Sequence, residues 1–231
     1  MNINGIFEIA LFPIPGCVCF PHTIMPLHVF EPRYRQMVKD CVEKKMLLGV
    51  CHTKSIERFA TRLTQEVKDK NDLHRLYKQN LSTFTPEDVF SAGTVSIAEI
   101  TEDGRYAIAV HMLKRFKILE IVSKDPYKIA RCIEYSDVEK MYFDDAPEST
   151  KEQRQLILDI LTKEVNKLSY KDENMLSEIQ NEVSVNRFTF KLFNFLRLPE
   201  LEMQEILNSQ CSIDRLNMLY RRLSAMAQSP E

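Results

Sequence analysis

Cys17, Cys19 and His22 form a Cys-x-Cys-x-x-His pattern near the start of the chain. Thiolate and imidazole groups are preferred ligands of Zn²⁺, and alternate residues of a β-strand point the same way, so the two cysteines could face one ion. A fourth ligand would have to come from His28, Cys51 or His52. The spacing fits no standard zinc module, however, and the cysteines alternate with Val18 and Phe20 in an apolar run. We therefore predict core thiols, with no metal and no other cofactor.

The sequence contains no recognisable pair of a nucleophile and a general base. Cys51 and His52 are adjacent, and adjacent residues of a strand point to opposite faces, so they cannot form a dyad directly. The acidic pairs Glu102-Asp103 and Asp144-Asp145 stand in turn or linker contexts, where solvated carboxylates are common. The five glycines are too widely spaced for a dinucleotide-binding or phosphate-binding loop. We predict no catalytic residue and no enzymatic activity.

The balance of charge argues against nucleic acid and membrane partners. The chain of 231 residues carries 31 Lys and Arg and 33 Asp and Glu, which gives a net charge of −2. Its basic cluster, Lys114-Arg115 with Lys117, has no interleaved aromatic residues, so a solvated strand face explains it. No apolar stretch is long enough to span a bilayer, and the N-terminus lacks the basic region of a signal peptide. We expect a cytoplasmic protein with reduced cysteines.

Up to about Tyr135 the pattern is mainly that of β-strands. The apolar runs are IFEIALF, MPLHVFE, MLLGVC, VFSAGTVSIAEI, RYAIAVHML, FKILEIV and YKIARCIEY. Asp103-Gly104 between two of these runs predicts a tight hairpin turn, and Lys114-Arg115 is expected to separate the next two strands. Short strands joined by tight turns predict a small barrel or sandwich.

Two segments within this region have a helical pattern. Glu31-Pro32 opens a predicted helix, because proline favours the first helical position. The apolar residues that follow predict one buried face, made of Tyr34, Met37, Val38, Cys41 and Val42. The polar stretch at residues 53–88 has roughly helical spacing and predicts one or two inserted helices.

After the predicted linker MYFDDAPEST, the period becomes helical from Glu148 to Met226. The expected buried stripes are Leu156, Ile160, Leu161, Val165 and Leu168, then Val185, Phe188, Leu192, Phe195 and Leu196. Pro199 is expected to open a short helix and Ser212 to cap the last one. Strands followed by helices predict an α+β fold, with a β-rich sub-domain at residues 1–138 and a helical bundle at residues 139–231.

Short motifs follow one another in a specific order along most of the chain. They are LFPIP from Leu11, FP at Phe20, PLHVFEPRY from Pro26, GTV and AEI from Gly93, DGR from Asp103, RFKILE from Arg115, PYKIAR from Pro126 and LRLP from Leu196. In this order and spacing the chain resembles the N-terminal domain of Lon proteases, in the form found in stand-alone Lon-domain proteins. His22 departs from that pattern, because the family has glycine there.

The resemblance implies a barrel like the PUA domain, followed by a helical bundle, and a role in substrate recognition. The phosphate-binding loop of the Lon ATPase is absent, as are the C-x-x-C pairs of zinc modules joined to this domain in ubiquitin ligases. The favoured hypothesis is a non-catalytic domain that binds unfolded polypeptides or a partner protein, a protease among them. The alternative is a PUA-like module that binds a small molecule or RNA.

Apolar residues around the strand-to-helix corner are the candidates for binding. A recognition domain holds its clients through exposed apolar side chains, which supply most of the binding energy. We predict a surface patch of Phe20, Met25, Phe30 and Tyr34. Glu31 is expected to pair with Arg33, Arg35 or a backbone amide near the helix start.

Overall fold

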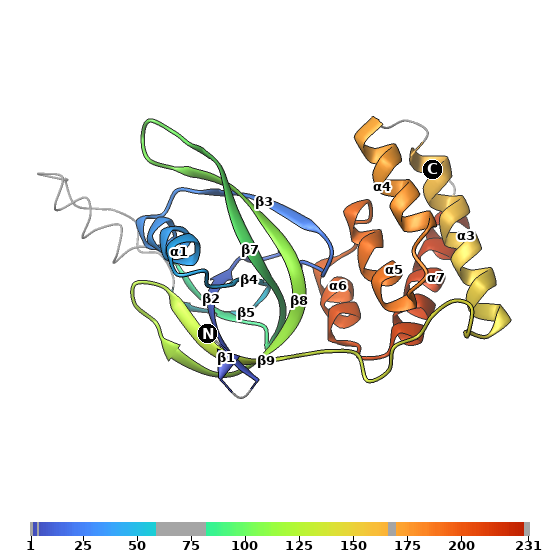
Figure 1. Cartoon of the computed structure of the whole chain (residues 1–231), viewed down its shortest axis with the longest axis horizontal. Coiled ribbons are helices and arrows are strands. Elements are labelled where there is room, and N and C mark those ends of the chain that lie inside the picture. The colour runs from blue at the N-terminus through green and yellow to red at the C-terminus, as the bar shows by residue number, and fades with distance from the viewer. Residues whose placement is uncertain (1, 4, 59–81, 166–169, 229–231) are drawn as a thin grey trace, which may run out of the picture. The chain divides into compact units, whose positions relative to one another are not determined.

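A computed structural model describes all residues except 1, 4, 59–81, 166–169 and 229–231 (Figure 1). By its contacts the chain divides into two compact units. Unit 1 comprises residues 1–20 and 24–135 and is built mainly of strands; unit 2 comprises residues 21–23 and 136–231 and is helical. The α+β fold class is therefore confirmed, whereas the domain boundary between residues 138 and 139 stays a prediction.

The strands of unit 1 pair into a closed ring. The strands are β1 (Asn2–Ile3), β2 (Ile6–Pro13), β3 (Ile24–Val29), β4 (Leu48–Cys51), β7 (Val89–Ile100), β8 (Tyr106–Ser123) and β9 (Lys128–Glu134). β2 pairs in parallel with β4, and antiparallel pairing then runs from β4 to β7, β8, β9 and back to β2. This closure agrees with the predicted barrel, while the PUA-like label stays a prediction.

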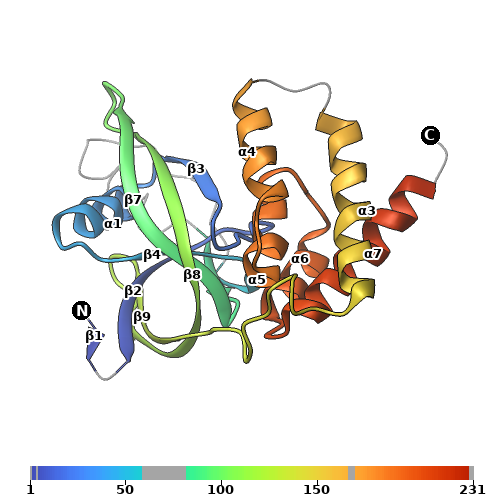
Figure 2. The ribbon, with the colours of Figure 1, turned by 45° about the vertical axis from the view of Figure 1, so that its right-hand side comes forward.

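The β7–β8 pair is longer than the ring requires (Figure 2). Its outer part, beyond Gly93, carries β3 on the free side of β8, so that three strands extend from the ring. The prediction of a strand break at Lys114-Arg115 is wrong, because β8 runs unbroken through both residues. Arg115 is buried there with its guanidinium over the ring of Tyr135, a contact that suits its aliphatic stem and planar head.

Helix α1 (Pro32–Glu43) packs its apolar face on the strands of unit 1. Pro32 opens the helix as predicted, and Met37, Val38 and Cys41 join the core cluster that also holds Ile108 and Val110 of β8. Val42 is exposed, which corrects the predicted face. The helix ends one residue later, at Glu43, so no further turn covers Val42.

The segment at residues 53–88 differs from its prediction at both ends. β5 (Thr53–Arg58) and β6 (Thr83–Pro86) pair as an antiparallel two-stranded sheet, where helices were expected. Ser55 and Thr85 face each other across this pair with their hydroxyl groups 3.2 Å apart. The central part of the expected helical insertion, residues 59–81, lies outside the described residues.

Unit 2 consists of helices around an apolar centre. They are α3 (Glu148–Val165), α4 (Tyr170–Gln180), α5 (Val185–Lys191), the 3₁₀ turn η1 (Leu192–Asn194), α6 (Glu200–Asn208) and α7 (Ser212–Gln228). Pro199 precedes α6 and Ser212 begins α7, as predicted. The prediction of the first buried stripe, on α3, is partly wrong. Leu156 is exposed and Ile157 is fully buried in its place, while Leu161 is buried as predicted.

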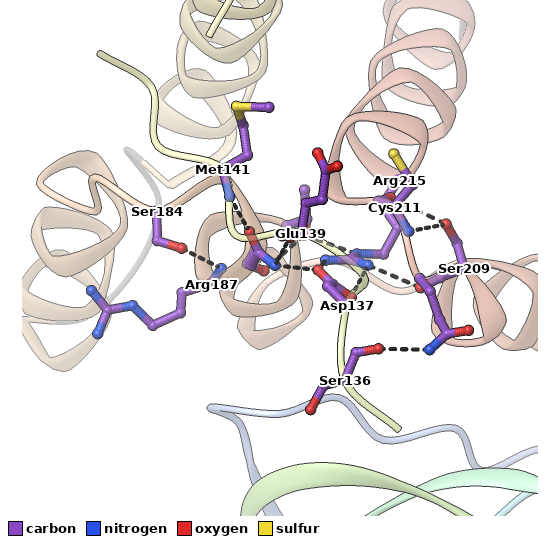
Figure 3. Close-up of polar contacts among 12 residues, drawn as sticks. Ser136, Asp137, Glu139, Met141, Ser184, Arg187, Ser209, Cys211 and Arg215 are labelled. Carbon is purple, nitrogen blue, oxygen red and sulfur yellow. Dashed lines mark hydrogen bonds and ion pairs between the residues drawn. The ribbon is translucent and has the colours of Figure 1, made fainter. Parts of the chain in front are cut away.

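The segment between β9 and α3, which contains the predicted linker from residue 141 onward, is tied to the helices by a buried ion pair just before that linker (Figure 3). The Arg215 guanidinium of α7 donates Nη1 to Oδ1 of Asp137 at 2.7 Å and Nη2 to Oδ2 at 2.5 Å. Asn186 also donates to Asp137, and Thr189 Oγ1 accepts from Arg215 Nε at 3.2 Å. Residues 136–147 are therefore part of the packed unit and not a free connection.

The cysteines lie mostly in the interior. Cys19, Cys41, Cys51 and Cys132 are buried, Cys17 is half-buried and Cys211 is exposed. Burial raises the pKa of the Cys41 and Cys132 thiols to about 12, which keeps these two groups protonated at neutral pH. Within the described residues, no cluster of three or more His, Cys, Asp or Glu side chains is arranged to hold a metal ion.

Candidate functional site

The four residues predicted to form a surface patch lie in different environments. Phe20 is only 1% exposed and Tyr34 only 6% exposed, so their predicted surface position is wrong. Tyr34 is held inside by the ring of Phe12, whose centroid lies 4.3 Å away, and burial raises its pKa to about 12. Met25 is half-buried against the core, whereas Phe30 is 59% exposed. Of the four, Phe30 alone offers most of its side chain to a ligand.

A pocket of about 510 Å³ opens within unit 1, beside the start of α1. It is lined by Pro32, Arg33, Arg35, Gln36 and Lys39 of α1, by Gly104 and Tyr106 at the β7–β8 turn, and by Pro126 of the β8–β9 turn. We name it the hairpin–helix pocket. Its walls come from three segments far apart in the sequence, which the fold of unit 1 brings together.

The start of α1 fixes the first wall. Pro32 occupies the first helical turn, where its missing N–H costs nothing, and Glu31 precedes it as the N-cap residue. Glu31 pairs with Arg33 through an Oε2–Nε distance of 2.8 Å, which confirms one of the predicted partners. The Arg33 guanidinium also lies 4.5 Å from the centroid of the Tyr34 ring and donates Nη2 to the Ser82 carbonyl at 3.0 Å. Arg33 is therefore fixed by three contacts.

Arg35 connects the helix to the β7–β8 turn. Its Nη1 donates to the Gly104 carbonyl at 2.8 Å and to the Asp103 carbonyl at 3.3 Å. Gly104 has φ +76°, a conformation that glycine adopts without the penalty of a Cβ atom, and an added Cβ would stand 2.8 Å from Arg35 Nη1. Glycine is thus favoured here by the turn, and an added Cβ would require the end of the Arg35 side chain to shift.

Apolar residues of the extended strands lie beside the lining residue Tyr106. Ile100 of β7 is opposite Tyr106 of β8, which is in turn opposite Val29 of β3, so the three side chains lie on one face of the sheet. Val29 is buried, but Ile100, at the open edge, is 57% exposed. Ile97 continues the exposed row one step along β7. Tyr106 lines the pocket, the exposed Ile100 is its cross-strand partner, and the exposed Phe30 is two residues before the lining residue Pro32.

Asp40 follows the pocket residue Lys39 in α1. Its carboxylate already has partners within the protein. It accepts from Tyr127 Oη at 2.5 Å and from Gln36 Nε2 at 2.9 Å, and it pairs with Lys44 at 3.3 Å. Partial burial opposes its charge, but these hydrogen bonds outweigh that effect and lower the pKa of Asp40. The same pairing and burial raise the pKa of Tyr127. Asp40 therefore stays ionised and does not enter the pocket lining.

The side chains that line the pocket are suited to non-covalent contacts. Its lining contains two arginines, a lysine, an amide, a phenol and two prolines, but no thiol, histidine or carboxylate. Such side chains bind by charge, hydrogen bonding and apolar contact, and Arg and Tyr are enriched at the centres of protein interfaces. The arrangement is therefore chemically suited to non-covalent docking of a polypeptide or another ligand.

Sequence reasoning missed Arg35, Tyr106 and Ile100 as members of a site. The helical pattern assigns Arg35 to the solvent face, and the Asp103-Gly104 turn is predicted, but nothing local links the two. Their contact joins residues 69 positions apart in the chain. Only the pairing of the strands and the packing of α1 determine that contact.

Comparison with known proteins decides the family. The family described as the ATP-dependent protease La (LON) substrate-binding domain matches residues 8–225. The chain belongs to this family. The predicted resemblance is thereby confirmed over most of the sequence.

Lon proteases and Lon N-terminal domains are the relatives found. Lon protease 1 of Herpetosiphon aurantiacus is 24% identical over 127 residues, which is 54% of this chain and 13% of that protease. The Lon protease of Halothermothrix orenii is 26% identical over 223 residues, 92% of this chain and 24% of that protease. This Lon domain thus spans a quarter or less of the curated relatives it matches.

Solved structures show the same fold. The Lon N-terminal domain protein from Xanthomonas campestris covers 96% of this chain with a TM-score of 0.58 and 17% identity, and 99% of that chain is matched. The N-terminal domain of the Mycobacterium avium complex Lon protease covers 94% with a TM-score of 0.61 and 10% identity, and 98% of that chain is matched. This Lon domain therefore has the Lon N-terminal fold. Among its described residues, no helix is long and apolar enough to cross a bilayer.

Proposed function

We propose that this Lon domain recognises polypeptides non-covalently and does no chemistry on them. The observation that carries the proposal is membership of a substrate-binding family over residues 8–225. The hairpin–helix pocket supports it, because its lining combines fixed arginines with the apolar surface of Tyr106 and two prolines and includes no thiol, histidine or carboxylate. The ligand is an unfolded polypeptide, or an extended segment presented by a partner protein such as a protease.

Side chains, and not strand addition, are the means of binding in this proposal. β3 lies at an edge of the described sheet, but Pro26 in its middle has no N–H to donate to an added strand. The outer part of β7 is irregular between Ile97 and Glu99, which interrupts an even row of hydrogen-bonding groups. Both edges are therefore poor templates for another strand. Binding must rely on Phe30, Tyr106 and Ile100.

Replacing Phe30 and Ile100 together by serine is expected to weaken polypeptide binding at least tenfold. Burial of these two side chains contributes about 1.5–3 kcal/mol each when complete, and about 1.4 kcal/mol corresponds to a tenfold change in Kd. Fluorescence anisotropy with a labelled, reduced and alkylated polypeptide measures the affinity. Gel electrophoresis of the same samples is expected to show the polypeptide intact.

The matched control is Leu119→Ser, because Leu119 is also more than half exposed but lies in the part of β8 that pairs with β9, away in sequence from the lining residue Tyr106. It is expected to keep the affinity of the unchanged domain. Thermal melting of all variants identifies any that are misfolded. Unchanged affinity in the correctly folded double variant would contradict the proposed location of binding, and steady cleavage of the polypeptide would contradict the non-catalytic role.

A further inference from the structure

We propose that the hairpin–helix pocket selects polypeptide segments in which a carboxylate side chain, Asp or Glu, stands next to an apolar residue. This inference rests on the proposed function and specifies its ligand. Three cationic side chains line the pocket, namely Arg33, Arg35 and Lys39, and no carboxylate does. The whole chain has a net charge of −2, so this concentration of positive charge is local to the pocket. A site with such lining attracts a negatively charged group.

The three cations are compensated to different degrees. Arg33 is paired with Glu31 at 2.8 Å, and both side chains are largely buried. Lys39 approaches Glu43 to 3.8 Å, but both side chains are more than half exposed, and an exposed pair at this distance contributes little. Arg35 forms no ion pair with any residue in the described part of the chain. The charges of Arg35 and Lys39 therefore remain available.

Arg35 is already oriented for a carboxylate. Its Nη1 is occupied by the Gly104 and Asp103 carbonyls, whereas Nε and Nη2 have no partner among the described residues. Nε and Nη2 lie along one edge of the planar guanidinium, and this edge can donate two parallel hydrogen bonds to one carboxylate. Because the two carbonyls fix the side chain beforehand, little conformational entropy is lost on binding.

The remaining lining favours a carboxylate within a polypeptide over a free anion. Tyr106, Pro32 and Pro126 add apolar surface to the lining; the exposed Ile100 is opposite Tyr106 in the sheet, and the exposed Phe30 is two residues before Pro32. A small anion would leave this apolar surface in water. An apolar residue beside the bound Asp or Glu covers it and gains the corresponding burial energy. The ligand class is therefore an acidic and apolar segment, extended enough to reach both the pocket and these neighbouring side chains.

Two labelled peptides test the inference. They have identical apolar residues and differ only in Glu against Gln at the central positions. We expect the unchanged domain to bind the Glu peptide about fivefold to tenfold more tightly, as charge-assisted hydrogen bonds at a partly exposed site predict. Lys39→Gln and Arg35→Gln are each expected to reduce this preference, and the double variant to abolish it, while binding of the Gln peptide persists. Lys117→Gln, an equal change of charge at an exposed residue of β8 outside the pocket, is expected to keep the preference.

Arg35→Lys separates the charge from the fork-shaped geometry. It keeps the positive charge but cannot make two parallel hydrogen bonds, so an intermediate preference is expected. Melting temperatures of the Arg35 variants show whether losing the hydrogen bonds to the β7–β8 turn destabilises the domain. If Arg35→Gln unfolds the domain, the Lys39→Gln variant, whose side chain is mostly exposed, still gives the answer.

Each outcome separates this inference from the proposed function. Equal affinity of the two peptides for the unchanged domain would overturn the inference and leave polypeptide binding intact. Failure of both peptides to bind would overturn the proposed function itself. Displacement of the Glu peptide by a single-stranded RNA oligonucleotide, at a lower concentration than by unlabelled peptide, would assign the pocket to phosphate and also overturn the inference.

Discussion

Replacing Arg215 by alanine is expected to lower the free energy of unfolding by about 3–5 kcal/mol, because it leaves the Asp137 carboxylate buried without its partner. The Arg215 side chain is 0% exposed and that of Asp137 is 4% exposed, so water cannot replace the lost contacts. The variant also loses the hydrogen bond to the Ser209 carbonyl at 2.9 Å and the stacking of the guanidinium over Phe190 at 4.2 Å. Urea denaturation followed by far-UV circular dichroism measures the change.

The control for this variant is Arg222→Ala on the same helix. Arg222 pairs with Glu202 at 3.1 Å, but both side chains are 41% exposed, so a loss of less than about 1 kcal/mol is expected. If Arg215→Ala were no more destabilising than Arg222→Ala, the ion pair would not anchor residues 136–147 to the helices of unit 2. A loss of several kcal/mol is a large share of the 5–15 kcal/mol typical of natural domains.

Replacing Gly93 by alanine is expected to destabilise the protein by about 3 kcal/mol, at the upper end of the usual cost of overpacking. An added Cβ would stand 1.8 Å from the His111 carbonyl oxygen and 2.9 Å from the Met112 Cα. Both are backbone atoms of β8, so no side-chain rotation can relieve the clash, and the two strands must move apart. Gly93 lies where the β7–β8 register shifts, between the ring and the extended part of the strands.

Thr94→Ala gives the matched comparison for Gly93→Ala. Thr94 is the next residue of β7 and its side chain is exposed, so its replacement is expected to change stability by less than about 0.5 kcal/mol. Differential scanning calorimetry compares the two variants with the unchanged protein. Equal melting temperatures for Gly93→Ala and the unchanged protein would contradict the close approach of β7 and β8 at this position.

Local sequence patterns predicted most of the elements. Pro32 and the apolar spacing after it predicted α1, and the Asp103-Gly104 turn predicted the β7–β8 hairpin. The prediction of a strand break at Lys114-Arg115 is wrong, because two consecutive charged residues do not have to interrupt a strand. The stem of Arg115 is buried while its guanidinium lies over Tyr135, and that contact depends on the fold.

The candidate site was much less predictable than the fold. The apolar corner residues were chosen for their type, but type does not determine which side of a strand or helix faces the core. Tyr34 of α1 packs on Phe12 of β2, whereas Phe30, directly after β3, is 59% exposed. The pocket itself depends on the contact between Arg35 and Gly104, which joins distant segments. Contacts of this kind arise from tertiary packing and have no local signature.

The central claim is that polypeptides bind at the hairpin–helix pocket. Nuclear magnetic resonance of the ¹⁵N-labelled domain, titrated with the acidic and apolar peptide, tests it most directly because it reports every backbone amide separately. The account predicts that chemical-shift changes concentrate at residues 30–39 and 97–106, and that the amides of α3, α6 and α7 stay unchanged. Changes confined to the helices of unit 2, or no changes at saturating peptide, would contradict it.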